Sequence, residues 1–111
     1  MAEPVTSVKD IFERYMPDRL QRKPDLVEKI NAVYLFNISG PNGGQWSVDC
    51  TQPGGMVAAG QVATASCTVA CSDVDFLNIV NGRLNAQMAF MSGKLRIQGD
   101  MGLAMKLQQI L

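Results

Sequence analysis

The segment 73–111 constrains the fold most strongly, because the spacing of its apolar residues changes along its length. Apolar side chains recur at the spacing of a helix face in two groups, at Phe76, Leu77 and Val80 and then at Met88 and Met91. Residues 94–98 alternate with period two, which is typical of a strand, and a closing helical pattern follows. The segment therefore predicts a helix, a second helix, a strand and a last helix.

Four more strands are predicted upstream, because apolar and polar residues alternate there between turn-forming sequences. They are expected at residues 31–39, 45–51, 56–59 and 67–71. The sequence GPNGG at 40–44 should join the first two strands as a hairpin. Phe36 and Ile38 would share one face of the first strand, and Trp46 and Val48 one face of the second.

The amino-terminal part is expected to be helical. Residues 7–16 carry an apolar stripe, formed by Val8, Ile11, Phe12, Tyr15 and Met16. Ser7, with Asp10 three residues later, is a typical helix start, and Pro17 is expected to end this helix. Residues 18–23 and 24–30 predict two short helical segments, with Pro24 in a first turn, where proline is accepted.

No catalytic group, metal or cofactor is expected. The chain has no histidine, and no Ser, Thr or Cys lies in a recognisable nucleophile motif. Asp73 and Asp75 are two nearby carboxylates, but with Ser72 they are better explained as the cap and first turn of a helix. The three cysteines lack the paired spacing of metal ligands. We therefore expect them to be small, buried apolar residues.

Charge and hydropathy exclude several classes of protein. Lys plus Arg and Asp plus Glu number ten each, so no basic surface is expected to attract nucleic acid. No apolar run approaches the length of a membrane-spanning helix, and the amino terminus lacks the pattern of a secretory signal. With 47% apolar residues, we expect one domain with its own core over residues 1–111.

Four of the seven methionines lie at positions 88, 91, 101 and 105. A methionine side chain is unbranched and polarizable, so it fills space of variable shape. Such a group is ordinary core in most proteins, but it also suits an interior that must fit a second molecule.

Three sequence blocks carry a resemblance to a known family: DVDFLNIVNGRLNAQMAF at 73–90, GKLRIQGDMGLAMKL at 93–107 and WSVD at 46–49. They resemble the sterol carrier protein 2 family of lipid carriers. The resemblance implies an α+β fold in which a five-stranded, mostly antiparallel sheet is covered by helices. It also implies an apolar tunnel that takes fatty acids, fatty acyl-coenzyme A or sterols.

The same resemblance assigns candidate lipid contacts. Phe76, Leu77, Met88, Phe90 and the segment 101–105, with Met101 and Met105 at its ends, would contribute to the tunnel or its lid. Val80, Met91 and the inward-facing Leu95 belong to the same apolar set. By their alternation alone, Phe36, Ile38, Trp46 and Val48 would form the floor.

The expected function is non-catalytic binding and intracellular transfer of lipids. Two alternatives remain open: an interaction or dimerisation module whose groove takes a partner helix, and a non-catalytic subunit that presents an acyl substrate to an enzyme. The protein is expected to be a monomer or weak homodimer.

A transient membrane contact is a weaker expectation, based on Arg83, Lys94, Arg96 and Lys106 against Asp100 alone in residues 83–111. A solvated rim is the preferred explanation of these charges. Because the chain ends in Gln-Ile-Leu rather than a peroxisomal tripeptide, a cytoplasmic location is expected.

Overall fold

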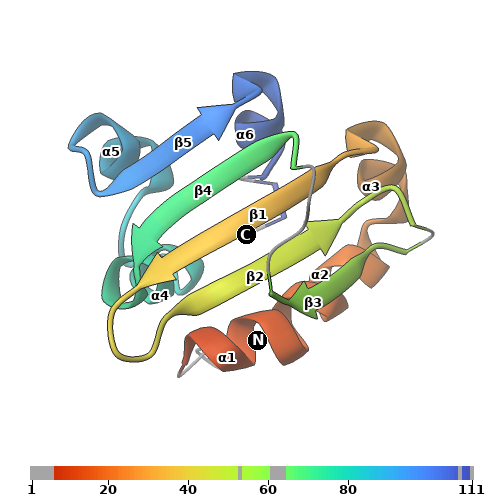
Figure 1. Ribbon diagram of the computed structural model, residues 1–111. Coiled ribbons are helices and arrows are strands. Elements are labelled where there is room, and N and C mark those ends of the chain that lie inside the picture. Colours follow the sequence, from red (N-terminus) through yellow and green to blue (C-terminus); the bar gives the residue numbers. More distant parts are fainter. Residues whose placement is uncertain (1–6, 53, 61–64, 108, 111) are drawn as a thin grey trace.

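The computed structural model describes residues 7–52, 54–60, 65–107 and 109–110 (Figure 1). Its helices are α1 Val8–Asp10, the π-helical turn η1 Ile11–Tyr15, α2 Met16–Arg22, α3 Pro24–Ile30, α4 Asp73–Val80, α5 Ala86–Met91 and α6 Met101–Leu107. Its strands are β1 Val33–Ser39, β2 Gly44–Asp49, β3 Met56–Ala59, β4 Cys67–Ser72 and β5 Leu95–Gly99. The predicted order of elements is confirmed.

The strands form one sheet in the order β3-β2-β1-β4-β5. β1 pairs antiparallel with β2, as do β2 with β3 and β4 with β5, whereas β1 and β4 are parallel. The α+β class with a mostly antiparallel five-stranded sheet is therefore confirmed. The parallel pair places β4 and β5 beside β1, so residues far apart in sequence share one surface.

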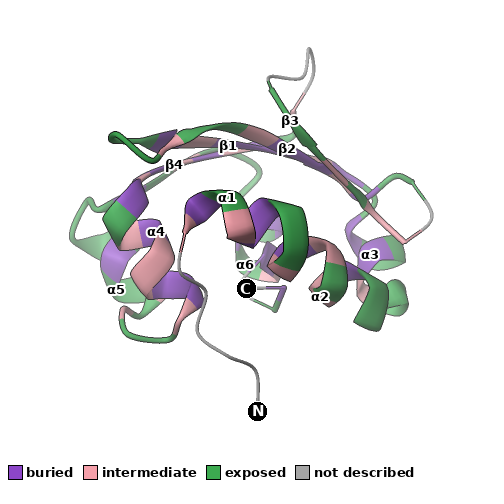
Figure 2. Cartoon of the chain, turned by 90° about the horizontal axis from the view of Figure 1, so that it is seen from below, coloured by how far each residue is buried: buried purple, intermediate pink, exposed green. Residues whose placement is uncertain are grey.

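The helices lie on one side of the sheet and leave its other face uncovered (Figure 2). On β1 the covered face carries Tyr34, Phe36 and Ile38, which are all buried. On the uncovered face the Gln45 side-chain amide donates a 2.7 Å hydrogen bond to the side-chain oxygen Oδ1 of Asn37 on the neighbouring strand. This alternation of apolar and polar residues is expected for a sheet that faces water on one side.

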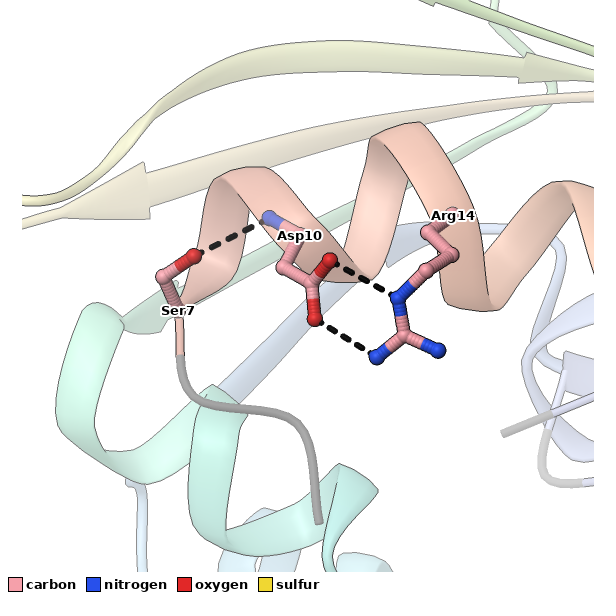
Figure 3. A network of polar contacts seen from close by, with 3 residues as sticks. All are labelled: Ser7, Asp10 and Arg14. Carbon is pink, nitrogen blue, oxygen red and sulfur yellow. Dashed lines mark hydrogen bonds and ion pairs between the residues drawn. The ribbon is translucent and has the colours of Figure 1, made fainter. Parts of the chain in front are cut away.

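The amino-terminal helix corrects one prediction. Ser7 caps it as expected, because its Oγ accepts a 3.1 Å hydrogen bond from the amide of Asp10. Arg14 donates to both carboxylate oxygens of Asp10, at 3.0 and 2.8 Å (Figure 3). This hydrogen bonding lowers the pKa of Asp10.

The expected helix end at Pro17 is wrong, because helical backbone continues to Arg22. The turn η1 is π-helical, and the amide of Met16 donates to the carbonyl of Ile11, five residues earlier. Pro17 then lies in the first turn of α2, where a missing amide is tolerated. The wider turn lets the apolar stripe reach the sheet without a break in the helix.

The first strand begins at Val33 rather than at residue 31, and the reason is local. Asn31 adopts φ 42°, a left-handed conformation that ends α3. The amide of Asn31 donates to the carbonyl of Val27 and completes that helix end. The chain can extend into β1 only after this residue.

Five aromatic rings fill the centre of the core beneath β1 and β2. Phe12 stacks on Trp46 and on Phe76, with ring centroids 5.0 and 5.5 Å apart and interplanar angles of 8° and 5°. Phe36 meets Phe12 edge-on at 5.2 Å, and Tyr34 lies 6.3 Å from Phe36. Because Phe12 comes from η1 and Phe76 from α4, the rings join both helical regions to the sheet.

The start of α4 is fixed by a buried carboxylate. Ser72 Oγ accepts from the amide of Asp75, which confirms Ser72 as a cap. Asp73 is 9% exposed, and its carboxylate accepts from the amides of Val74 and Asn42. A Cβ at Gly40 would lie 2.4 Å from this carboxylate, so the turn after β1 requires glycine there. Asp73 therefore ties α4 to the β1–β2 hairpin.

All three cysteines are free and buried, as predicted. Burial raises the pKa of the Cys50 thiol and of the Cys71 thiol to about 11, and it also raises the pKa of Cys67. The thiols are therefore protonated at neutral pH and serve as packing groups rather than nucleophiles.

Replacing Phe12 tests the aromatic core. We expect Phe12→Ala to lower the free energy of unfolding by about 3 to 5 kcal/mol, because it opens a cavity and removes three ring contacts. Urea unfolding followed by Trp46 fluorescence measures the loss. The control is Val74→Ala, since Val74 is an exposed helix residue. A loss for Phe12→Ala within about 0.5 kcal/mol, the range of surface substitutions, would contradict this account.

Candidate functional site

An apolar cavity of about 230 Å³ lies between the covered face of β4 and β5 and the helices α4, α5 and α6. The sheet contributes Val69, Leu95 and Ile97, and α4 contributes Phe76 and Ile79. The other side is formed by Ala86, Gln87 and Phe90 of α5 and by Met101, Ala104, Met105 and Leu107 of α6. Its walls therefore come from the carboxy-terminal segment and β4.

Five of the predicted site residues line this cavity: Phe76, Phe90, Leu95, Met101 and Met105. Phe90, Met101 and Met105 are also solvent-exposed, Met105 by 71%. These three side chains therefore form the apolar mouth between α5 and α6. Phe76 is fully buried and forms an inner wall.

The other predicted residues lie elsewhere. Phe36, Ile38, Val48 and Val80 are buried in the core, and Trp46 stacks on Phe12. Leu77 lines a separate small hollow with Ser7 and Val8. Met88 and Met91 lie on α5 and are 67% and 79% exposed. The structure thus places the cavity floor on β4 and β5, because the η1 side chain Phe12 occupies the space beneath β1 and β2.

Six lining residues were not predicted: Val69, Ile79, Ala86, Gln87, Ile97 and Leu107. Ala104 also lines the cavity and lies within the predicted segment 101–105. Val69 and Ile97 could have been found from the alternation of apolar residues along their strands. In the structure Val69 pairs with Ile97 and Cys71 with Leu95, so these residues share one face of the sheet. Ala86 is too small to stand out in a hydrophobic pattern. Gln87 is polar and gave no signal for an apolar cavity.

Hydrogen bonds hold both mouth helices at their ends. Asn85 Oδ1 caps α5 by accepting from the amides of Gln87 and Met88, at 2.8 and 3.2 Å. Asp100 Oδ1 accepts from the amides of Gly102 and Leu103 at the start of α6. The backbones are therefore positioned by capping, while the side chains at the mouth are exposed to solvent.

Tyr34 anchors α6 to the centre of the sheet. Its hydroxyl is buried and donates a 2.6 Å hydrogen bond to the carbonyl of Leu103. Burial raises the pKa of Tyr34, so the hydroxyl remains a donor throughout the physiological range. Without this bond the buried Tyr34 hydroxyl would be left without a partner in apolar surroundings.

The chemistry of the lining is apolar. None of the twelve described lining residues carries a titratable side chain, so the cavity offers no acid, base or nucleophile. Among the residues that the structure describes, no cluster of His, Cys, Asp or Glu has the arrangement of a metal site. What the cavity can do is remove a hydrocarbon chain from water.

No helix in the described part of the chain has the length and apolar character that crossing a membrane requires.

The fold and the cavity together define a class: small α+β domains whose helices enclose an apolar cavity against one face of a mixed sheet. Residues 10–111 match the family model described as the SCP-2 sterol transfer family. The chain therefore belongs to this family, and the resemblance drawn from the sequence is confirmed.

Relatives and solved structures support this assignment. The chain is 47% identical over 85 residues to peroxisomal multifunctional enzyme A of Dictyostelium discoideum. The matched residues make up 75% of this chain and 19% of that protein. The sterol carrier protein domain 2 of Helicoverpa armigera is 32% identical, with a TM-score of 0.73 and coverage of 98% of this chain and 91% of that one. Palmitated SCP2L2 of Aedes aegypti is 28% identical, with a TM-score of 0.71 and coverage of 95% and 94%.

The chain spans about a fifth of the length of the curated relatives it matches. Some of these relatives are multifunctional enzymes in which the matching part is one region of a longer protein.

Substituting Tyr34 tests the anchor of α6. We expect Tyr34→Phe to lower the free energy of unfolding at pH 7 by about 1 to 3 kcal/mol, because the Leu103 carbonyl loses its buried donor. The folded-state pKa of Tyr34 is raised, so its stabilisation is complete below the unfolded pKa of about 10 and is lost as pH rises above it. The advantage of the unsubstituted protein should therefore shrink in alkaline solution.

Urea titrations at several pH values measure this difference. Tyr15→Phe is the control, since the Tyr15 hydroxyl makes no hydrogen bond to another described residue. Equal stabilities of Tyr34→Phe and the unsubstituted protein at pH 7 would rule out the anchoring role.

Proposed function

We propose that this domain binds the hydrocarbon chain of a lipid in the α5–α6 cavity and transfers the lipid without catalysing a reaction. The candidate ligands are fatty acids and fatty acyl-coenzyme A, with sterols as further candidates. The observation that carries the proposal is the apolar cavity, which opens between side chains that can change shape. The palmitate in the name of the Aedes aegypti structure supports a fatty acyl ligand.

The magnitudes agree with this function. A chain of about fourteen methylenes gains roughly 0.8 kcal/mol for each one buried, about 11 kcal/mol in gross terms. Association and ordering cost about 4 to 15 kcal/mol, which leaves room for micromolar binding without a strong headgroup contact.

Ligand entry requires the mouth to open further. The cavity of about 230 Å³ is smaller than the roughly 300 to 1,000 Å³ of pockets that enclose larger ligands. Phe90, Met101 and Met105 are the side chains whose movement would enlarge it, because they line the cavity and are exposed. Methionine suits this role because its unbranched side chain adapts at low cost.

Binding should follow chain length. We expect each added methylene of a saturated fatty acid to tighten binding about fourfold until the cavity is full, as measured by displacement of a fluorescent lipid. Ala86→Phe, which narrows the mouth, should weaken binding by more than about tenfold, because about two methylenes are displaced. Ala58→Phe is the matched control, because Ala58 is exposed on β3, outside the cavity.

A response that does not depend on chain length would contradict burial as the source of affinity. Equal weakening by Ala86→Phe and Ala58→Phe would place the ligand outside this cavity.

A second candidate is a non-catalytic domain that presents an acyl substrate to an enzyme. The match to a fifth of a multifunctional enzyme favours it. A partner helix in the groove, or a second copy of the chain, is the remaining alternative. Native mass spectrometry of freshly purified protein distinguishes these: co-purified lipid on a monomer supports the carrier, and a lipid-free dimer supports the interaction module.

We place the domain in the cytoplasm. Its three free, buried thiols suit a reducing compartment. The peroxisomal location in the name of the Dictyostelium discoideum relative belongs to that longer protein.

We propose that α5 makes a transient contact with membranes when lipid is exchanged. Met88 and Met91 are three residues apart on this helix, so they project from the same side, and both are more than two-thirds exposed. Phe90 of the same helix lies at the cavity mouth. An exposed apolar helix face beside a lipid cavity can enter the interface of a bilayer.

Removing this apolar surface should separate membrane contact from lipid binding. For the double variant Met88→Gln, Met91→Gln we expect about tenfold weaker binding to vesicles and unchanged affinity for a fatty acid in solution. Met56→Gln is the control, since Met56 is 57% exposed on β3. Vesicle flotation measures the first property and fluorescent displacement the second. Vesicle binding that survives the double substitution would exclude α5 as the contact.

A further inference from the structure

Gln87 is the only residue with a polar side chain among the twelve described residues that line the cavity. It lies in the first turn of α5, next to the mouth residue Phe90 on the helix surface, and it is exposed. A ligand whose tail is enclosed by Val69 and Phe76 would therefore leave its polar end near this amide.

The backbone around Gln87 is held in place while its side chain is free. The amide of Gln87 donates to Asn85 Oδ1 at 2.8 Å. At the other end of the helix, the amide of Lys94 donates to the carbonyl of Ala89 at 2.9 Å. The side-chain amide of Gln87 makes no hydrogen bond to another described residue, so both its NH₂ group and its oxygen are available to a ligand.

We propose that Gln87 selects lipids by the polar end of the chain and favours neutral groups, namely the carbonyl of an ester or thioester or the hydroxyl of an alcohol. This inference rests on the proposed function and adds a specificity residue to it. The amide NH₂ donates to a carbonyl, and the amide oxygen accepts from a hydroxyl. None of the described lining residues carries a positive charge, so an ionised carboxylate that enters the cavity loses water without gaining a counter-charge from them.

An acyl thioester fits this arrangement well. Its carbonyl would reach Gln87 at the mouth, its hydrocarbon chain would occupy the cavity, and the rest of the molecule would stay in water. An ionised fatty acid must instead keep its carboxylate outside the mouth, which leaves less of its chain buried.

The test compares ligands with the same chain and different ends: hexadecane, hexadecanol, methyl palmitate and palmitate. Displacement of a fluorescent lipid gives each affinity. For Gln87→Leu we expect hexadecanol and methyl palmitate to bind about two- to tenfold more weakly, the effect of one ordinary hydrogen bond, with hexadecane binding unchanged. Gln98→Leu is the matched control, because Gln98 is an exposed amide on β5 that does not line the cavity.

Gln87→Glu gives a second, independent readout. A carboxylate accepts hydrogen bonds but does not donate them. This variant should therefore keep its affinity for hexadecanol and lose affinity for methyl palmitate. If Gln87 had only a structural role, its substitution would change the affinity for all four ligands alike. The affinities for the alcohol and the ester would then not change differently.

Failure of this inference differs from failure of the proposed function. If the unsubstituted protein binds none of the four ligands, the carrier function is wrong. If it binds them and the Gln87 variants keep the same ratio between polar-ended chains and hexadecane, the carrier function stands and Gln87 is not the selective residue.

Discussion

The stacking of Phe12 on Trp46 and Phe76 determines where the interior is solid and where it is hollow. Phe12 projects from η1 into the space beneath β1 and β2, and it closes that half of the sheet. Phe76 takes part in this stack and also lines the cavity. One ring is therefore both the edge of the packed core and the inner wall of the cavity, and the cavity is confined to β4, β5 and the carboxy-terminal helices.

The two halves of the interior also differ in how their helices are held. The amino-terminal helices are joined to the sheet by large buried rings, whereas α5 and α6 are short and depend on capping by Asn85 and Asp100 and on the Tyr34 hydrogen bond. Capped backbones with exposed methionines give a rigid frame whose side chains can move. Such a division explains how one fold combines a stable core with an opening for a ligand.

Local sequence patterns predicted the strands and the order of elements, and alternation placed Leu95 on the inner face of its strand. The family resemblance supplied the other four predicted cavity residues, Phe76, Phe90, Met101 and Met105. Local patterns alone favoured ordinary core for those four. They did not predict which strands form the floor, because alternation shows which side chains share a face but not which strands are neighbours. Phe36 and Leu95 both lie in alternating strand patterns, yet only Leu95 lines the cavity. The difference depends on where each strand lies in the sheet, which is set by the parallel pairing of β1 with β4. That pairing joins segments far apart in the sequence, so no local pattern reveals it. The prediction that Pro17 ends the first helix was wrong for a related reason. The π-helical turn that precedes Pro17 has no distinct amino-acid composition, so its presence could not be predicted from the sequence.

The absence of titratable side chains from the described lining has a chemical consequence. Under the proposed function, an acyl chain held there would meet no acid, base or nucleophile from the described lining residues, and a thioester at the mouth would not be hydrolysed by them. Affinity then comes mainly from burial of methylenes, which all acyl lipids share, and selectivity must come from the few polar atoms at the rim. The same property would suit the second proposed role, because a domain that presents an acyl substrate without chemistry of its own does not compete with an enzyme for the chemical step.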